Sequence, residues 1–291
     1  MNNLAQRIDR IVLGTVQLGI DYGVGNLSGK PTRREALNIL DVAWESGIRL
    51  FDTAPSYGSE ELLGEFIRSN GVQKEIRILT KIPSLTASAI KLNEVNRNLE
   101  MSLETLSSGV ETLFFHDPED ASWLLKDPDY FHALLNAYPV SFLGVSAYEP
   151  RQISELQKTR FKLAVQFPLN ILDRRFEQVF LPSGKRYARS ILLQGLLAST
   201  GSLRPGTPLQ LLTLRREYLD RLDSVGLDSL TAALTYIHWN QNVDHFLIGV
   251  DSDEQLRDIL GRPLYEGTAL QSAEFDNLSI DRHWFDPRQW N

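Results

Sequence analysis

The chain has 291 residues, with 30 Lys and Arg against 37 Asp and Glu, and a formal net charge of −7 at pH 7. This balance excludes the basic surface with which proteins bind nucleic acids. The absence of cysteine excludes disulfides, thiolate nucleophiles and cysteine-ligated metals, and it fits a cytoplasmic protein. The amino terminus is too polar for a signal peptide, and no apolar run approaches the roughly 18 residues of a membrane helix. We therefore expect a soluble protein without nucleic-acid or membrane partners.

Short apolar runs alternate with helical patterns along the whole chain, without a linker or a low-complexity segment. Eight strand-then-helix units predict an α/β protein with one closed parallel barrel, a (β/α)8 TIM barrel, rather than an open sheet. We expect a single domain over residues 1–291, in which residues 267–291 form a C-terminal tail without clear periodicity. The predicted strands are residues 11–16, 50–51, 76–80, 112–115, 141–145, 163–165, 191–193 and 245–249.

Several helix starts are marked by capping residues. Thr32 and Glu35 have the spacing of a capping box, and so do Ser252 and Gln255 after the last strand. The interval before the eighth strand is about twice as long as the others and holds two helical stretches. Thr207 is the predicted cap of the first of them.

Three stretches approach known motifs without fulfilling them. The glycine-rich residues 19–29 have neither P-loop nor G-x-G-x-x-G spacing, and we interpret them as a loop over the barrel mouth. Residues 144–148 lack the second glycine of a nucleophile elbow. Residues 116–120 hold one histidine and three carboxylates, but consecutive residues after one strand rarely converge on an ion. We therefore expect no metal site.

Polar residues end three successive predicted strands: Asp52, Lys81 and His116, with Tyr57 in the turn after the second strand. Because strand ends of a parallel barrel surround one mouth, we expect these four side chains to meet at its C-terminal face. The Lys81 ammonium would lower the pKa of the Tyr57 phenol, and Asp52 would keep Lys81 charged. His116 would donate a hydrogen bond to a carbonyl oxygen. Each residue taken alone also fits a structural role, but the combination favours carbonyl reduction with Tyr57 as the proton donor.

The order of motifs from residue 11 to about residue 260 resembles the aldo-keto reductase superfamily. The resemblance implies a (β/α)8 barrel that binds a nicotinamide cofactor, NADPH or NADH, without a Rossmann fold. It implies Asp52, Tyr57, Lys81 and His116 as the catalytic residues, with Tyr57 as the acid. The matching segments are Leu13-Gly-Thr15, Phe51-Asp-Thr-Ala-Pro-Ser-Tyr-Gly58, Leu79-Thr-Lys81, Phe115-His116, Gly144-Val-Ser146, Gln166, Gln194-Gly-Leu-Leu197 and Ile248-Gly-Val-Asp-Ser-Asp-Glu-Gln-Leu256.

The same resemblance assigns cofactor contacts position by position. Ser146 and Gln166 would hold the nicotinamide carboxamide, and Gly14 and Thr15 would approach the cofactor from the first strand. Four residues around the seventh strand would line the ribose and pyrophosphate, and the residues that open the last helix would meet the adenosine. These remaining assigned positions are Arg189, Ser190, Leu192, Gln194, Gly195, Gly249, Asp251, Ser252 and Gln255.

Two positions depart from the family pattern. Many members bind the 2′-phosphate of NADPH with a Lys or Arg after the eighth strand, where this chain has Asp251 and Gln255. A carboxylate there would repel a phosphate, so both NADH and NADPH stay open. Arg189 stands where an aromatic residue usually stacks on the nicotinamide. A guanidinium can also stack on a ring, and its charge would favour an anionic or phosphorylated substrate.

The substrate is expected to be a small carbonyl compound, and a polar pocket would favour a sugar-like one. The predicted substrate contacts are Gln17, Tyr22 and Trp123. His283 and Trp284 of the tail either close over the mouth or pack on the side of the barrel, and we expect packing. A monomer or a small homo-oligomer is expected.

Two other functions stay open. Members of this family also serve as redox-sensing regulatory subunits that bind cofactor and turn over slowly. A cofactor-free barrel that uses Lys81 as a Schiff-base amine is the third interpretation.

Overall fold

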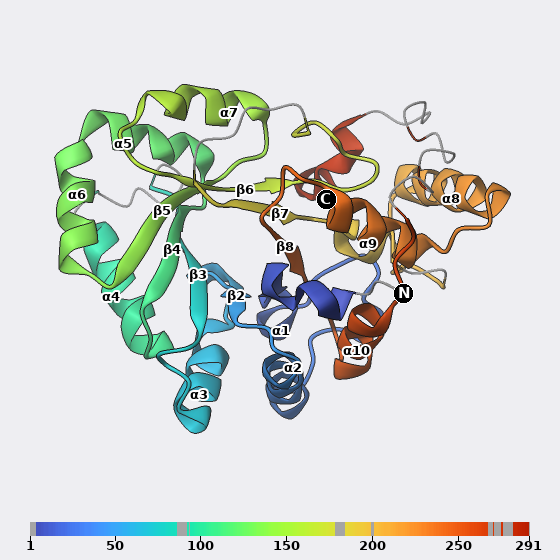
Figure 1. Cartoon of the computed structure of the whole chain (residues 1–291), viewed down its shortest axis with the longest axis horizontal. Helices are drawn as coiled ribbons and strands as arrows, with labels where there is room; N and C mark the ends of the chain where they lie inside the picture. The colour runs from blue at the N-terminus through green and yellow to red at the C-terminus, as the bar shows by residue number, and fades with distance from the viewer. Residues whose placement is uncertain are drawn as a thin grey trace.

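The computed structural model describes residues 4–85, 92, 94–177, 184–198, 201–266, 270, 275 and 282–290. At its centre is a closed barrel of eight parallel strands in sequence order, in which β8 pairs with β1 (Figure 1). The predicted (β/α)8 barrel is therefore confirmed. The strands are β1 (Ile11–Gly14), β2 (Leu50–Asp52), β3 (Arg77–Ile82), β4 (Val110–Phe115), β5 (Val140–Ser146), β6 (Ala164–Pro168), β7 (Arg186–Arg189) and β8 (His245–Ile248).

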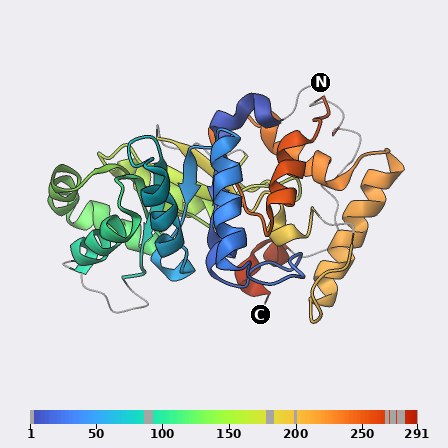
Figure 2. The ribbon, with the colours of Figure 1, turned by 90° about the horizontal axis from the view of Figure 1, so that it is seen from below.

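Helices surround the barrel, and the long α8 lies at the opposite end of the molecule from α6 (Figure 2). No helix in the part of the chain that the structure describes is long and apolar enough to cross a membrane. The α-helices are α1 (Val16–Gly19), α2 (Arg33–Glu45), α3 (Glu60–Asn70), α4 (Glu94–Leu106), α5 (Trp123–Lys126), α6 (Pro128–Ala137), α7 (Pro150–Ser154), α8 (Leu209–Ser224), α9 (Ser229–Trp239) and α10 (Asp253–Gly261). Short 3-10 helices are η1 (Leu4–Arg10), η2 (Pro55–Tyr57), η3 (Pro118–Ser122), η4 (Glu155–Lys158), η5 (Leu193–Gly195), η7 (Arg282–Phe285) and η8 (Pro287–Gln289).

The predicted position of the seventh strand, residues 191–193, is wrong. The strand that pairs with β6 and β8 is β7, whose arginines flank only two buried residues, so its sequence lacks a long apolar run. The apolar residues that follow lie beyond the strand end, where the backbone turns sharply. Ser190, Leu193 and Gln194 have φ angles of 57°, 45° and 54°. This segment therefore forms a tight loop at the barrel mouth.

The predicted capping residues are only partly confirmed. The capping box of Thr32 and Glu35 is present at the start of α2. Ser252 caps α10, because its hydroxyl accepts a hydrogen bond from the backbone N–H of Gln255. The Gln255 side chain, however, accepts from the backbone N–H of Asp251, one residue before the cap. The predicted Thr207 cap of α8 is wrong, because its hydroxyl donates to the Arg204 carbonyl and the helix begins after Pro208.

Two sets of side chains fasten the base of the barrel. The guanidinium of Arg10, which is 7% exposed, donates to the carbonyls of residues 238, 240, 243 and 244, at 2.6 to 3.2 Å. These carbonyls lie at and before the start of β8, so Arg10 ties the start of β1 to that segment. Glu111 accepts hydrogen bonds from Arg77, Lys185 and the Tyr187 hydroxyl.

Candidate active site

The barrel interior is stacked in layers, and the layering places the candidate site. Successive side chains of a strand point to opposite faces, so residues two apart point the same way. Asp52, Lys81 and His116 each follow by two positions a residue of one buried apolar cluster. Gln166 and Arg189 do the same on β6 and β7. That cluster is Val12, Leu50, Leu79, Phe114, Ala164 and Tyr187.

Lys81 and Asp52 form a buried ion pair. The ammonium Nζ donates to Asp52 Oδ1 and Oδ2 at 2.9 and 2.8 Å, and to the Thr53 carbonyl at 2.8 Å. The two side chains are 1% and 4% exposed. Burial on its own lowers the pKa of Lys81, but the Asp52 carboxylate and the Tyr57 phenol outweigh it, and the net pKa is raised. Lys81 is therefore a permanent cation beneath the site.

Tyr57 and His116 lie beside each other above this pair. Their rings meet edge to face with centroids 6.1 Å apart, and Lys81 Nζ lies 4.7 Å from the Tyr57 ring centroid. Burial raises the pKa of Tyr57, and Lys81 opposes this rise without cancelling it. The expected net lowering of that pKa is therefore wrong in this structure, although Lys81 acts in the expected direction. The phenol stays protonated at neutral pH, as a proton donor must.

His116 is held neutral. Burial, followed by the charge of Lys81, lowers the pKa of His116 to about 4. A neutral imidazole has one N–H to donate and one nitrogen to accept. His116 can therefore donate a hydrogen bond to a carbonyl oxygen without acting as an acid at neutral pH.

Buried hydroxyls support the turn that carries Tyr57. The Ser59 hydroxyl lies 2.8 Å from that of Thr15 and 3.0 Å from that of Thr53. Thr15 also donates to the Asp52 carbonyl at 3.0 Å. On the outer side, a Cβ on Gly19 would lie 1.9 Å from the Tyr57 carbonyl oxygen, so only glycine fits there. Thr15, assigned to the cofactor from the sequence, is placed behind the cavity as a support of this turn.

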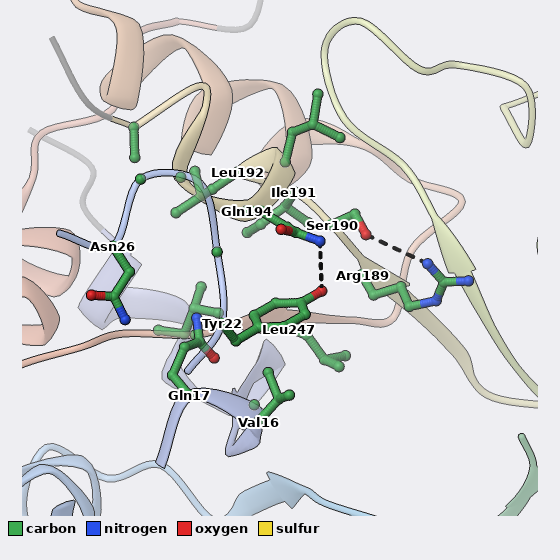
Figure 3. Close-up of a pocket in the computed structure, with 18 of the residues that line it drawn as sticks. Val16, Gln17, Tyr22, Asn26, Arg189, Ser190, Ile191, Leu192, Gln194 and Leu247 are labelled. Carbon is green, nitrogen blue, oxygen red and sulfur yellow. Dashed lines mark hydrogen bonds between the residues drawn. The ribbon is translucent and has the colours of Figure 1, made fainter. Parts of the chain in front are cut away.

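The barrel mouth holds a cavity of about 390 Å³, a size typical of small-molecule sites (Figure 3). Most of the predicted site residues line it. They are Gly14, Gln17, Tyr22, Asp52, Tyr57, His116, Ser146, Gln166, Arg189, Ser190, Leu192, Gln194, Gly195, Gly249, Asp251 and Gln255.

Four predicted site residues do not line the cavity. Lys81 and Thr15 are buried behind it, and Ser252 caps α10. Trp123 lies in α5, where it packs against the hydrophobic core with Lys126 over its ring at 4.9 Å. The structure does not bring Trp123 to the other site residues.

The glycine-rich loop crosses the mouth and adds residues that sequence reasoning did not name. Gly25 donates its backbone N–H to the Gln194 carbonyl at 3.0 Å, and the Gln194 amide donates to the Tyr22 hydroxyl at 3.1 Å (Figure 3). A Cβ on Gly195 would lie 2.9 Å from the Gly25 Cα. Asn26, also in the cavity lining, donates to Asp251 Oδ1 at 2.9 Å. The richness in glycine was the only sequence signal for this contact.

Several polar side chains line the cavity. Gln17 Oε1 is buried without a hydrogen-bond partner among the described residues, so it can still accept a bond from a ligand amide. Gln166 Nε2 donates to Asp52 Oδ1 at 2.8 Å, which orients this side chain toward the catalytic pair. At the far side, burial raises the pKa of Asp251 to about 6. Arg189 is the only lysine or arginine among the described residues that line the cavity.

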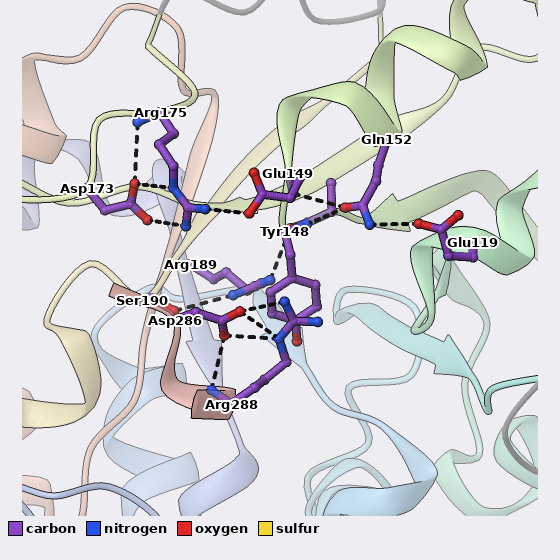
Figure 4. A network of polar contacts seen from close by, with 11 residues as sticks. Glu119, Tyr148, Glu149, Gln152, Asp173, Arg175, Arg189, Ser190, Asp286 and Arg288 are labelled. Atoms are coloured by element: carbon purple, nitrogen blue, oxygen red, sulfur yellow. Dashed lines mark hydrogen bonds and ion pairs between the residues drawn. The ribbon is translucent and has the colours of Figure 1, made fainter. Parts of the chain in front are cut away.

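Residues 282–290 of the tail both pack on the barrel and reach the cavity rim. Trp284 packs against the main hydrophobic core, as expected for the tail. A few residues later, Arg288 stacks on Tyr148, a cavity residue that sequence reasoning did not select (Figure 4). No group of three or more His, Asp or Glu able to hold a metal ion occurs within the described ranges.

Comparisons with known proteins agree with this geometry. The chain is 28% identical to the aldo-keto reductase YhdN of Bacillus subtilis over 65% of its length, and the match spans only 58% of that relative. It is 25% identical to the oxidoreductase YrpG of the same organism, over 87% of each chain. The solved glycerol dehydrogenase of Gluconobacter oxydans shares the fold, with a TM-score of 0.68 and 20% identity over 91% of this chain and 90% of that one. The family model of the aldo/keto reductases matches residues 10–278, and the chain therefore belongs to the aldo/keto reductase family.

Proposed function

We propose that the protein reduces a small aldehyde or ketone to an alcohol, with a nicotinamide cofactor as the hydride donor and NADH preferred over NADPH. The observation that carries this proposal is the arrangement of Tyr57 and His116 in one cavity above the buried pair of Lys81 and Asp52. It provides a protonated phenol, a neutral hydrogen-bond donor and a fixed cation at one place.

The reduced nicotinamide, when bound, supplies the hydride. His116, as a neutral imidazole, donates its N–H to the substrate carbonyl oxygen and orients it. Tyr57 transfers its phenolic proton to the same oxygen as negative charge develops there. Lys81 stabilises the phenolate that remains on Tyr57, and Asp52 holds Lys81 in place.

The residues that would hold the nicotinamide are Ser146, Gln166 and Gln17. All three line the cavity, and the unpaired Gln17 oxygen needs a donor such as a carboxamide N–H. Asp251 supports the choice of NADH. Its carboxylate lies in the lining, can accept hydrogen bonds from ribose hydroxyls, and would repel a 2′-phosphate.

The test compares the wild type with Tyr57→Phe, using 4-nitrobenzaldehyde and either NADH or NADPH, by loss of the reduced cofactor's absorbance. We expect turnover with a preference for NADH, and a kcat lower by roughly 100- to 10,000-fold in Tyr57→Phe because the acid is lost. The affinity for NADH, measured by the fluorescence of the reduced nicotinamide, should be unchanged in the variant. Equal kcat values would exclude Tyr57 as the acid, and an absence of cofactor binding would exclude the reductase.

A matched variant tests the cofactor preference. Asp251→Ser removes the charge but keeps a short hydrogen-bonding side chain. We expect the ratio of kcat/KM for NADPH to that for NADH to rise by roughly tenfold, since a nearby charge repulsion is removed. An unchanged ratio would show that Asp251 does not face the 2′ position.

A further inference from the structure

Two guanidinium groups enclose one aromatic ring at the rim of the cavity. Arg189 Cζ lies 4.1 Å from the ring centroid of Tyr148, and Arg288 Cζ lies 3.3 Å from it (Figure 4). Tyr148 follows β5, Arg189 ends β7, and Arg288 belongs to η8. A cation over the face of a tyrosine is favourable, so this stacking holds both side chains in place.

The three arginines near Tyr148, which are Arg175, Arg189 and Arg288, differ in whether a carboxylate compensates their charge. Arg288 is paired with Asp286, at 2.5 Å between Nη2 and Oδ2. The neighbouring Arg175 is paired with Asp173 and Glu149, at 2.8 and 2.7 Å (Figure 4).

Arg189 forms no ion pair with any residue that the structure describes. Its Nη2 donates to the Ala147 carbonyl at 3.0 Å and its Nη1 to the Ser190 hydroxyl at 3.5 Å. Its Nε is buried without a hydrogen-bond partner among the described residues. A cation with an unused donor normally interacts with an anion.

The position of Arg189 relates it to the catalytic residues. It lines the cavity, two positions after the interior residue Tyr187 on β7. Tyr187 belongs to the buried cluster whose members lie two positions before Asp52, Lys81 and His116, so Arg189 lies in the same layer of the barrel as these residues. Tyr148, on which Arg189 stacks, lines the same cavity as Tyr57.

We propose that Arg189 binds an anionic group, a carboxylate, on the carbonyl substrate, so that carboxylated aldehydes or oxo acids are preferred over neutral carbonyl compounds. This inference rests on the proposed carbonyl reduction. A planar guanidinium held against a ring can bind a carboxylate through two parallel hydrogen bonds. Cofactor phosphates are the other source of an oxyanion, and the position of Arg189 beside the catalytic residues favours the substrate.

The experiment uses two aldehydes of similar shape that differ in charge, 4-carboxybenzaldehyde and methyl 4-formylbenzoate. kcat/KM for each aldehyde and KM for NADH are measured for the wild type, Arg189→Met, Arg189→Lys and Arg288→Met. Arg288→Met is the matched control, because Arg288 stacks on the same Tyr148 ring but does not line the cavity. Titration with benzoate, followed by calorimetry, measures carboxylate binding without turnover.

We expect the wild type to prefer the carboxylate. Arg189→Met should lower kcat/KM for 4-carboxybenzaldehyde by roughly 10- to 100-fold and weaken benzoate binding, because a charge-assisted contact is lost. The loss of kcat/KM for the ester should be smaller, so that the ratio of the two kcat/KM values falls, and circular dichroism checks that the variant is folded. Arg189→Lys should keep part of the preference for the carboxylated aldehyde. Arg288→Met should change kcat/KM for each aldehyde by less than about threefold.

Several results would overturn the inference. Equal kcat/KM for the two aldehydes in the wild type would do so while leaving carbonyl reduction intact. If Arg189→Met raised the KM for NADH and lowered kcat/KM for the two aldehydes equally, Arg189 would be assigned to the cofactor phosphates. If neither aldehyde were reduced, the proposed function would fall, and benzoate binding that is identical in wild type and Arg189→Met would separately refute the carboxylate site.

Discussion

The buried ion pair of Lys81 and Asp52 offers a test of how the charges of the candidate site affect the stability of the protein. Lys81→Met would leave the Asp52 carboxylate buried, with the Gln166 amide as its remaining side-chain donor. Removing one partner of a buried pair costs about 3–5 kcal/mol, because the remaining charge is uncompensated. For a chain of 291 residues, the unfolding entropy per residue converts this loss to a Tm lower by roughly 5–8 °C.

The double variant Asp52→Asn with Lys81→Met removes both charges. The amide introduced by Asp52→Asn would still accept the bond from Gln166 and would match the shape of the carboxylate, and the methionine side chain fills most of the volume of Lys81. Replacing a buried pair by uncharged groups is often neutral. We therefore expect the double variant to be more stable than Lys81→Met, within about 2 kcal/mol of the wild type.

Equilibrium unfolding in urea gives all four free energies of this double-mutant cycle. Strong coupling, with the double variant more stable than either single variant, is the expected result. Additive losses would refute the reasoning, since they would mean that each side chain contributes through its own packing and not through compensation of the other's charge.

Two further predictions concern pH and the barrel base. The pKa of His116 is lowered from 6.5 to about 4 in the folded protein. Between these pH values, His116 is protonated in the unfolded chain but neutral in the folded one. Stability should therefore fall on acidification from pH 6.5 to 4, and by less in His116→Gln. In contrast, kcat/KM for the aldehyde at saturating NADH should show no inflection near pH 6.5. An equal pH dependence of unfolding in both proteins would contradict this. Arg10→Met should lower the free energy of unfolding by about 2–4 kcal/mol, because four backbone carbonyls lose a charged donor. Arg7→Met, at an exposed side chain, is its control, and equal losses in the two variants would exclude this role for Arg10.

The positions of the candidate catalytic residues could be predicted because they follow from periodicity. In a parallel barrel, a polar residue at the carboxyl end of a buried strand reaches the mouth. Asp52 ends β2, Lys81 is one residue before the end of β3, and His116 directly follows β4. The seventh strand could not be found in this way. Its arginines serve the site and the barrel base, so β7 lacks the apolar run that marks a strand, and the apolar residues after it form a loop instead.

Features that depend on contacts between distant segments could not be predicted. The stack of Arg288 on Tyr148 joins residues 140 positions apart, and the hydrogen bond from Asn26 to Asp251 joins residues 225 positions apart. The direction of the Tyr57 pKa shift depends on two opposing effects. Sequence reasoning named the attraction to Lys81, but only the structure showed that desolvation of the phenol outweighs it.

The pairing of β1 with β8, here called the seam, closes the barrel. The two halves of the candidate site differ in whether they depend on this closure. The seam pairs Val12 with Leu247, across most of the chain, and contacts of such sequence separation form late in folding. The four candidate catalytic residues lie between residues 52 and 116, on β2 and β3 or in the segments that follow β2 and β4, and the pairing of these three neighbouring strands needs no such closure. The candidate cofactor residues Gly14 and Gly249 lie on opposite sides of the seam. A loosened seam would therefore impair the cofactor side of the mouth first and leave the catalytic residues together.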